Sequence, residues 1–348
     1  MRRTLVLLAL LAAAASLGAE QTAANPHRSI PEVPPDARAR TVSDVIDKAM
    51  AWLAVHPADI RDGDVIGVTE EIMFFYALST IATHSAANRN FRREIAARHT
   101  ALAAFHRDSL RSGSPLQGNW VALTYPPLAH IVARMGLENT PYRAVIDQRL
   151  ASRADSVAPR QAMQLWIAVY LERLGYTPDT PVPTLLAGSA LQQDPQTHTL
   201  LGHFAAVPGS ADTRQATIQL VYNITHEIIA LTDFGALRPP AVMVAQAGHY
   251  ARLLNAAIAW ATRESAIDVL AELIFCAHLL ELHDLAAAPG GLELIMNSQQ
   301  DDGSFGITNP DRANGRRHGV LTCLLALSTL ESGALGLPVG NRNDRKPG

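Results

Sequence analysis

Apolar residues from position 41 onward recur every three or four residues, which is the spacing of one face of an α-helix. The first such stripe lies in residues 41–56 and consists of Val42, Val45, Ile46, Ala49, Met50 and Leu53. Thr41 or Ser43 is the candidate N-cap of this helix. No stretch alternates apolar and polar residues between hairpin turns, so we expect almost no β-sheet.

The same spacing predicts about twelve helices joined by short loops. The strong segments are residues 41–56, 69–84, 90–110, 117–135, 140–153, 159–174, 212–232, 240–263, 264–282, 291–299 and 315–330, and the weaker ones are 181–191 and 196–206. Gly136, Gly175 and Pro178 supply stop signals. Short connections make successive helices antiparallel neighbours, which gives about six helical hairpins.

Three segments, residues 218–231, 267–280 and 320–330, are apolar nearly all round. Helices of this kind belong in the interior, covered by others. No sequence period appears, which argues against tetratricopeptide-like or ankyrin-like arrays. We therefore predict an all-α fold, an α/α toroid of about six helical hairpins around a central cavity.

Residues 222–235, which read YNITHEIIALTDFG, carry polar side chains in an otherwise apolar helix. His226 and Asp233 lie seven residues apart, which places them two turns apart on nearly one stripe. Polar groups in a packed interior must be paired or functional. We therefore take His226 as a candidate metal ligand and Asp233 as a candidate catalytic group.

A second polar stripe consists of Asp268, Glu272 and Cys276, which are spaced by four residues and share one helix face. His318 lies near the start of the last strong helix. Inner helices would bring these side chains together at one end of the cavity. Because His, Cys and carboxylate are the ligands that zinc prefers, we predict zinc bound by His226, Cys276 and His318. Asp268 or Glu272 would be a fourth ligand or the general base.

Each of these residues also has a structural interpretation. Glu272 would pair with Arg252 or Arg263, and Asp268 would lie in a first helical turn, where the helix dipole favours a carboxylate. The histidines would hydrogen-bond to neighbouring helices or to water. The two cysteines of the chain would be inert core residues or a disulfide pair, which the sequence leaves open.

Residues 299–306, which read QQDDGSFG, resemble the Q-x-x-D-G-S-F-G loop of the terpenoid cyclase and protein prenyltransferase toroids. In physical terms, Asp302-Gly303 suits a tight turn with a positive φ, and Phe305 would plug a gap between neighbouring hairpins. The segment that begins at His318 resembles the one by which a prenyltransferase β-subunit contributes a zinc-binding histidine. This resemblance extends over about the last 130 residues and implies a toroid with a zinc site.

The chain departs from the prenyltransferase pattern at its other ligands. Those enzymes use an Asp, a Cys and a His, whereas Asp268 and Cys276 lie eight residues apart here instead of within one tight motif. The stretches THEIIALTDFG and DVLAELIFC resemble a family of uncharacterised bacterial helical proteins. That second resemblance implies a helical fold and does not point to any particular activity.

Composition and missing motifs exclude several classes. The formal charge is −3 with no dominant Lys/Arg cluster, so we expect no nucleic-acid partner. The sequence lacks a Gly-rich phosphate loop, G-x-S-x-G, H-E-x-x-H, D-D-x-x-D and D-x-D-D. Only 5% of the residues are aromatic, which argues against an isoprenoid cyclase, because aromatic ring faces stabilise carbocations.

The N-terminus has the layout of a secretory signal. Arg2 and Arg3 precede an apolar run, Leu5–Ala15, and small residues follow near Gly18 and Ala19. We expect a signal peptide at 1–19, a disordered tail at 20–40, the toroid domain at 41–333 and a disordered C-terminal tail at 334–348. The mature protein would be exported, with no stable membrane span after cleavage.

Three functions follow from this pattern. The first is an exported, metal-dependent, zinc-like enzyme that acts on a small molecule or peptide in the central cavity. The second is a polysaccharide lyase or glycosidase on an α/α barrel, with Tyr222, Asn223, His226 and Tyr250 at its site. The third is a non-catalytic protein that binds a small ligand or a peptide. The substrate, the reaction and the oligomeric state stay open.

Overall fold

The computed structural model describes residues 41–60, 64–82, 86–111, 119–152, 161–187, 189, 201–205, 211–286, 289–305 and 313–334. The predicted signal peptide and both predicted tails lie outside the described residues, apart from Ala334. The described part of the chain holds no β-strand, and its one antiparallel bridge joins Gln299 to Phe305. The all-α prediction is therefore confirmed.

The described residues form a series of helices. They are α2 (Val42–Val55), α3 (Val65–Ile81), α4 (Ala86–Arg111), α5 (Asn119–Arg134), α6 (Thr140–Ser152), α7 (Gln161–Arg173), α8 (Val182–Ala187), α10 (Ala211–Thr232), α11 (Ala241–Ala245), α12 (Ala247–Arg263), α13 (Ile267–Leu279), α14 (His283–Ala286), α15 (Pro289–Asn297) and α16 (Ala313–Ala334). No helix in the described ranges is long and apolar enough to cross a membrane.

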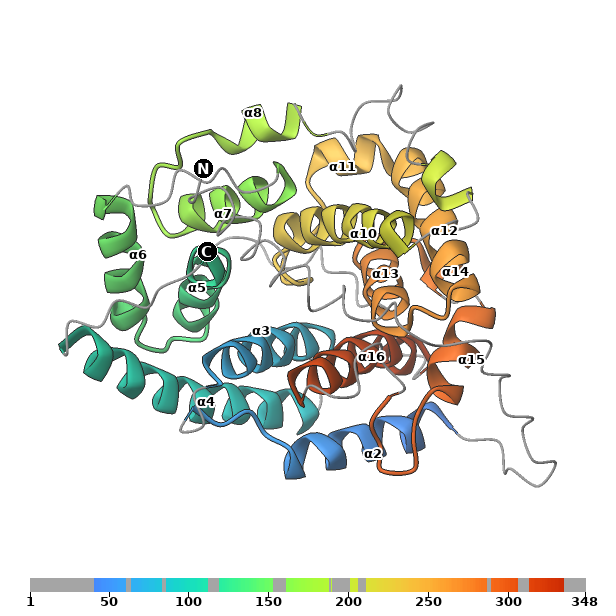
Figure 1. The fold of residues 1–348 in the computed structure, drawn as a ribbon, viewed down its shortest axis with the longest axis horizontal. Helices are drawn as coiled ribbons and strands as arrows, with labels where there is room; N and C mark the ends of the chain where they lie inside the picture. The colour runs from blue at the N-terminus through green and yellow to red at the C-terminus, as the bar shows by residue number, and fades with distance from the viewer. Residues whose placement is uncertain are drawn as a thin grey trace, which may run out of the picture.

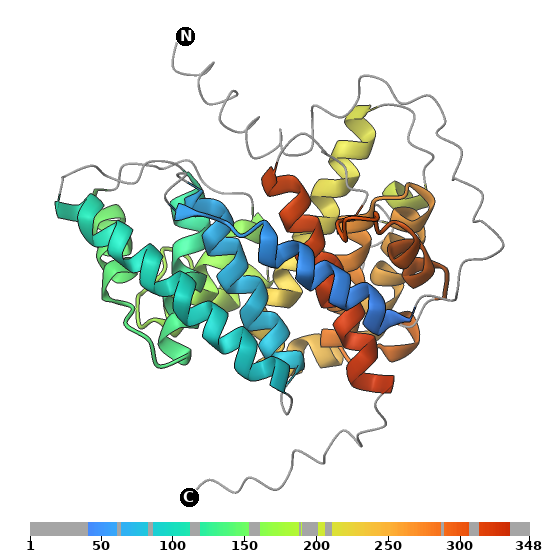
Figure 2. The ribbon, with the colours of Figure 1, turned by 90° about the horizontal axis from the view of Figure 1, so that it is seen from below.

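Six helices contact one another in sequence order. Helix α3 contacts α5, α5 contacts α7, α7 contacts α10, α10 contacts α13, α13 contacts α16, and α16 contacts α3 again (Figure 1). The others lie outside these six: α4 packs on α3, α6 on α5, α8 on α7 and α12 on α13. Helix α2 runs across α16, as Figure 2 shows.

Sequence pattern explains which helices lie inside. Every described residue of α13 except Asp268 and His278 is buried, as the all-round apolar pattern of residues 267–280 predicts. Helix α12 buries one face only, from His249 to Ala261, because its other face is polar or small. The innermost and outermost positions thus follow from how much of each helix surface is apolar.

Helix ends follow ordinary capping chemistry. Thr41 caps α2 and forms a capping box with Asp44, as predicted. Helix α3 begins at Val65, four residues before the predicted start, because the side chain of Asp64 accepts a hydrogen bond from the Gly67 N–H at 2.9 Å. Gly136 and Gly175 end their helices with φ of 71° and 83°, which confirms both as stop signals.

The predicted single helix at 240–263 is wrong, because the chain forms α11 and α12 instead. The break lies at Gln246, whose φ of −111° and ψ of 19° are not helical. Its N–H bonds to the carbonyl of Met243, three residues back, which tightens the last turn of α11 and redirects the chain.

The loop at 299–305 has the predicted turn. Gly303 has φ of 93°, and the Gln300 N–H donates to the Ser304 carbonyl at 2.7 Å across the turn. Phe305 is only 2% exposed and belongs to the core. The Gln299 side chain donates to the carbonyl of Val45 at 2.8 Å, so this loop fastens the chain to α2.

Candidate functional site

Polar side chains from four inner helices meet inside the molecule. Nε2 of His318 on α16 lies 3.5 Å from Oε1 of Glu272 on α13, and Nδ1 lies 3.9 Å from Oε2 of Glu70 on α3. The hydroxyl of Thr225 on α10 donates to Oε2 of Glu272 at 3.0 Å. We call this set, completed by the neighbouring residues Tyr222, His226 and Asp268, the interior polar cluster.

Several side chains of the interior polar cluster are partly exposed, although they lie among buried residues. The side chain of His318 is 28% exposed and that of Glu70 is 13% exposed, although the neighbouring Val320 and Leu321 are fully buried. Tyr222, His226 and Asp268 are also partly exposed. Water thus reaches these groups, while burial still dominates their electrostatics.

The pair formed by His318 and Glu272 is ionic at neutral pH. Burial alone would lower the pKa of His318, but the hydrogen bond with Glu272 and the charge of Glu70 raise it to about 9. Burial likewise opposes ionisation of Glu272, yet His318 and His226 hold the pKa of its carboxyl below its ordinary value. Each partner therefore keeps the other charged.

His226 has the opposite protonation. Its Nδ1 lies 2.8 Å from the carbonyl of Tyr222, so Nδ1 carries the hydrogen and Nε2 carries the lone pair. Burial lowers the pKa of His226 despite the nearby charge of Glu272, so the imidazole is neutral at pH 7. Within the described residues Nε2 accepts no hydrogen bond. The rings of Trp166 and Tyr222 lie 5.2 Å and 5.8 Å away.

The two remaining carboxyl groups of the cluster have pKa values above their ordinary values. Burial raises the pKa of Glu70 and of Asp268, and the charge of Glu272 raises both further, while His318 opposes the rise. Burial and these carboxylates also raise the pKa of Tyr222. The cluster therefore holds titratable groups whose pKa values are shifted in opposite directions.

Cys276 does not present a thiolate to the cluster. Its thiol donates to the carbonyl of Thr225 at 3.7 Å, and burial raises its pKa well above the ordinary value. Cys276 and Cys323 are both buried and free, so they form no disulfide. The predicted ligand set does not fit zinc in this protonation state, because zinc binds thiolate and neutral imidazole, whereas His318 is an imidazolium.

A search of the described residues finds no group of three or more His, Cys, Asp or Glu side chains arranged to hold a metal ion. His226, Glu272 and His318 do converge, as the sequence predicts, but through an ion pair and the Thr225 hydroxyl. Zinc binding thus stays a prediction of the sequence.

Asp233 belongs to a different group of side chains. It is fully buried at the end of α10, where Tyr76 donates to its Oδ2 at 3.1 Å. His130 and Arg134 lie 3.2 Å from the same oxygen, and Arg173 lies 3.5 Å from Oδ1. These contacts give Asp233 a structural role, since two helix-terminal arginines balance its charge and a tyrosine and a histidine contact the same carboxylate.

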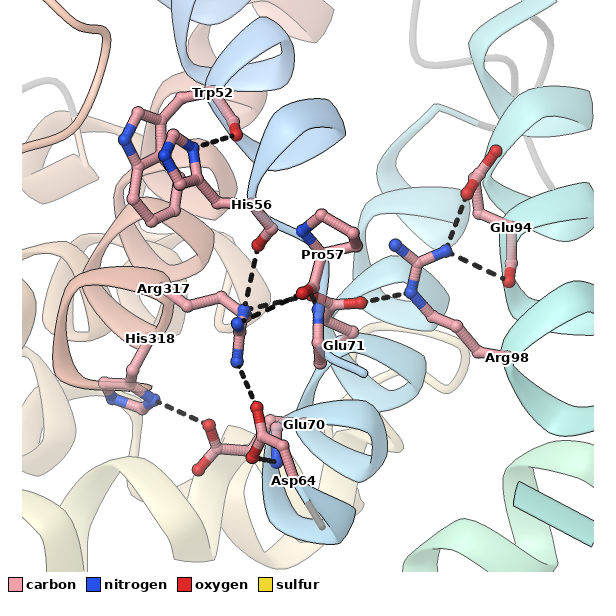
Figure 3. A network of polar contacts seen from close by, with 12 residues as sticks. Trp52, His56, Pro57, Asp64, Glu70, Glu71, Glu94, Arg98, Arg317 and His318 are labelled. Carbon is pink, nitrogen blue, oxygen red and sulfur yellow. Dashed lines mark hydrogen bonds and ion pairs between the residues drawn. The ribbon is translucent and has the colours of Figure 1, made fainter. Parts of the chain in front are cut away.

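A buried ion network lies beside the interior polar cluster (Figure 3). Glu71 is fully buried and pairs with Arg98 on α4 and with Arg317 on α16, whose Nε lies 3.2 Å away. Arg317 also donates to Asp64 at 2.6 Å. Sequence reasoning missed Glu70 and Glu71. The signal was present, because two adjacent glutamates interrupt the apolar segment VIGVTEEIMFFYALSTI.

Only part of the set proposed for a lyase belongs to the interior polar cluster. Tyr250 on α12 is fully buried and donates to Oε1 of Glu227, whose Oε2 accepts from Ser189 at 2.7 Å. Tyr222 and His226 belong to the interior polar cluster, where their rings contact each other. Tyr250 therefore has a partner of its own.

Residues 40–320 match the family described as a domain of unknown function, DUF6895. The chain belongs to this family. The DUF6895 match includes every residue of the interior polar cluster, from Glu70 to His318, and confirms membership of an uncharacterised family. It gives no support to the terpenoid cyclase resemblance. No curated protein and no solved structure matches the chain.

Proposed function

We propose that this DUF6895 protein is an exported enzyme on an α/α toroid and that it carries out acid–base chemistry at the interior polar cluster. The toroid is supported by the contacts between successive helices of one set: α3, α5, α7, α10, α13 and α16. The last of them, α16, contacts the first, α3. Export rests on the signal-like residues 1–19.

The observation that carries the proposal is the different contacts of two histidines in one cluster. Nδ1 of His226 faces the carbonyl of Tyr222, whereas both ring nitrogens of His318 face carboxyl groups. His226 is neutral with its lone pair on Nε2, and His318 is an imidazolium. Thr225 and Glu272 connect them. Titratable groups whose pKa values are driven apart in one site supply a base and an acid at the same pH.

The roles follow from the contacts. His226 accepts a proton from the substrate at Nε2, because Nδ1 is committed to the Tyr222 carbonyl. His318 donates a proton or stabilises developing negative charge. Glu272 orients and charges His318, as a carboxylate does in other acid–base histidine pairs.

The charge of the cluster bears on the substrate. Three carboxyl groups, Glu70, Asp268 and Glu272, lie beside the one imidazolium, His318, so the interior polar cluster favours neutral or cationic groups over anions. A polyuronate substrate would meet these carboxyl groups without a compensating arginine in the cluster. This argues for a neutral or cationic small molecule, peptide or glycan over the uronate of a lyase.

The test joins protonation to activity. The protein is incubated with neutral glycans, polyuronates, esters and peptides, and products are followed by mass spectrometry. We expect turnover of a neutral or cationic substrate that His226→Gln and His318→Gln each reduce by about 10²-fold or more. His203→Gln, at an exposed position, is the matched control.

Side-chain NMR of the same proteins tests the assignment without a substrate. We expect His318 to titrate well above His226. His226 titrating above His318, or full turnover in His226→Gln, would overturn the acid–base proposal. Specific ligand binding with no turnover of any substrate would favour the non-catalytic alternative.

A further inference from the structure

Two adjacent residues on each of two helices point to different partners. On α3, Glu70 faces His318, whereas Glu71 faces Arg98 and Arg317. On α16, Arg317 reaches Glu71 and Asp64, whereas His318 reaches Glu70 and Glu272. Figure 3 shows Arg317 and His318 leaving α16 in different directions. The buried ion network and the interior polar cluster thus share the same two helices.

Successive residues of an α-helix are separated by about 100° around its axis, so fixing one residue fixes the direction of the next. The Arg317 guanidinium is held on several sides. Its NH1 donates to Asp64 at 2.6 Å, and it also donates to the carbonyls of His56 and Pro57 at 3.3 Å. These contacts determine how α16 is rotated against α3, and with it the position of His318.

Stability alone does not account for this network. A buried ion pair is often no more stabilising than apolar residues of the same size, because both charges lose their hydration. Glu71 is fully buried and the Arg317 side chain is 7% exposed, so the desolvation cost applies to both. What such a network supplies is one fixed arrangement of the helices.

We propose that Arg317, held by Glu71 and Asp64, is a positioning residue that places His318 against Glu272 and Glu70. This inference rests on the proposed function, because it concerns the histidine that would act as the acid. In this proposal Arg317 acts through the position of His318 and not on a substrate.

Replacing Arg317 distinguishes a positioning role from a simple charge effect, because the two predict opposite changes in the pKa of His318. Loss of the Arg317 charge alone would raise the pKa of His318, since a nearby cation is removed. Loss of positioning would lower it, since His318 moves away from Glu272 and Glu70. We expect Arg317→Met to lower the pKa of His318 by about one unit or more.

Arg317→Lys is the second variant, because it leaves a cation beside Glu71 and Asp64 and so disturbs folding less than Arg317→Met. It retains the charge but loses the planar, multi-pronged guanidinium. A positioning role predicts a lower pKa of His318 in this variant too. A pure charge effect predicts no change in that pKa, because Lys keeps the charge. Arg316→Met is the control, because it removes a charge from the neighbouring, partly exposed position on α16.

The measurement is side-chain NMR of His318, assigned by comparison with His318→Gln. An unchanged or raised pKa of His318 in both Arg317 variants overturns the positioning role and leaves the proposed function standing. A His318 that titrates near its ordinary value in the unaltered protein overturns the proposed function instead. The two failures are therefore distinguishable.

Discussion

Glu272 and His318 form an ion pair inside the molecule, with 3.5 Å between Oε1 and Nε2. The second carboxylate oxygen of Glu272 accepts the Thr225 hydroxyl at 3.0 Å. Glu272 is therefore satisfied on both oxygens, as a carboxylate that is 7% exposed must be. The charge of His318 depends on this partner, which gives a direct test.

Glu272→Gln should lower the pKa of His318 from about 9 toward its ordinary value of about 6.5, while Glu70 keeps part of the rise. Because the folded state raises this pKa, the His318 contribution to stability is complete below about pH 6.5 and is lost as pH rises through about 9. Urea unfolding at pH 6 and pH 9.5 should therefore differ less in Glu272→Gln, by on the order of 1–3 kcal/mol. The exposed Glu293→Gln should keep the difference.

Zinc binding at His226, Cys276 and His318 would release protons from the protein. The Cys276 thiol and the His318 imidazolium must each lose a proton before they coordinate a metal. Zinc affinity should therefore rise steeply with pH, and titration calorimetry in buffers of different ionisation enthalpy should record about two protons released. Protein without stoichiometric zinc on elemental analysis, and without a thermal shift on adding zinc, would rule the site out.

Gly303→Ala should destabilise the fold by about 2–4 kcal/mol, because a Cβ there would lie 2.4 Å from the Lys48 carbonyl oxygen at a φ of 93°. Gly136→Ala is the matched control. Its φ of 71° carries similar strain, but nothing lies within 4 Å of the added Cβ. Chemical denaturation should thus show a larger loss for Gly303→Ala. Equal losses would contradict the close packing of this loop on α2.

The sequence predicted the features that depend on local spacing. The all-round apolar pattern of residues 267–280 identified a helix that is buried on all sides, and Asp302-Gly303 identified a turn with a positive φ. Both are set by residues within a few positions of one another. His226, Glu272 and His318 were recognisable as candidates, because polar groups stand out in apolar helices.

Partners far along the chain could not be predicted in the same way. Glu70 meets His318 only because α16 returns to α3, and nothing in local spacing pairs the two. The partners of Asp233 were hidden in the same way, because Tyr76, Arg134 and Arg173 come from other helices. The sequence also could not predict the raised pKa of the Cys276 thiol. That pKa follows from burial, and the thiol donates to the Thr225 carbonyl.

His106 should make the fold sensitive to mild acid. It is fully buried, its Nε2 lies 2.8 Å from the Tyr125 hydroxyl, and burial lowers its pKa to about 4. The unfolded chain therefore takes up this proton first, and stability falls between about pH 6.5 and 4, by up to about 3 kcal/mol from this group. In His106→Gln, unfolding free energies across that window should fall less steeply. The exposed His203→Gln should follow the unaltered protein.

Asp233→Asn should destabilise the protein by about 3–5 kcal/mol, because Arg134 and Arg173 would lose the carboxylate that balances them in a buried place. The positive φ of 51° at Asp233 adds nothing to this cost, because Asn adopts the left-handed region as readily as Asp. Denaturant unfolding at pH 7 measures the loss. Asp301→Asn, at an exposed position, is the control.

The acid dependence of the same variant tests the charge directly. His130 and the two arginines hold the pKa of Asp233 below its ordinary value, although burial opposes ionisation. This contribution is present above about pH 4 and is lost as pH falls further, because the folded carboxyl must then take up a proton. Asp233→Asn should therefore differ from the unaltered protein at pH 7 and approach it at pH 2–3. A gap that stays constant with pH would assign the loss to packing and not to the ion pairs.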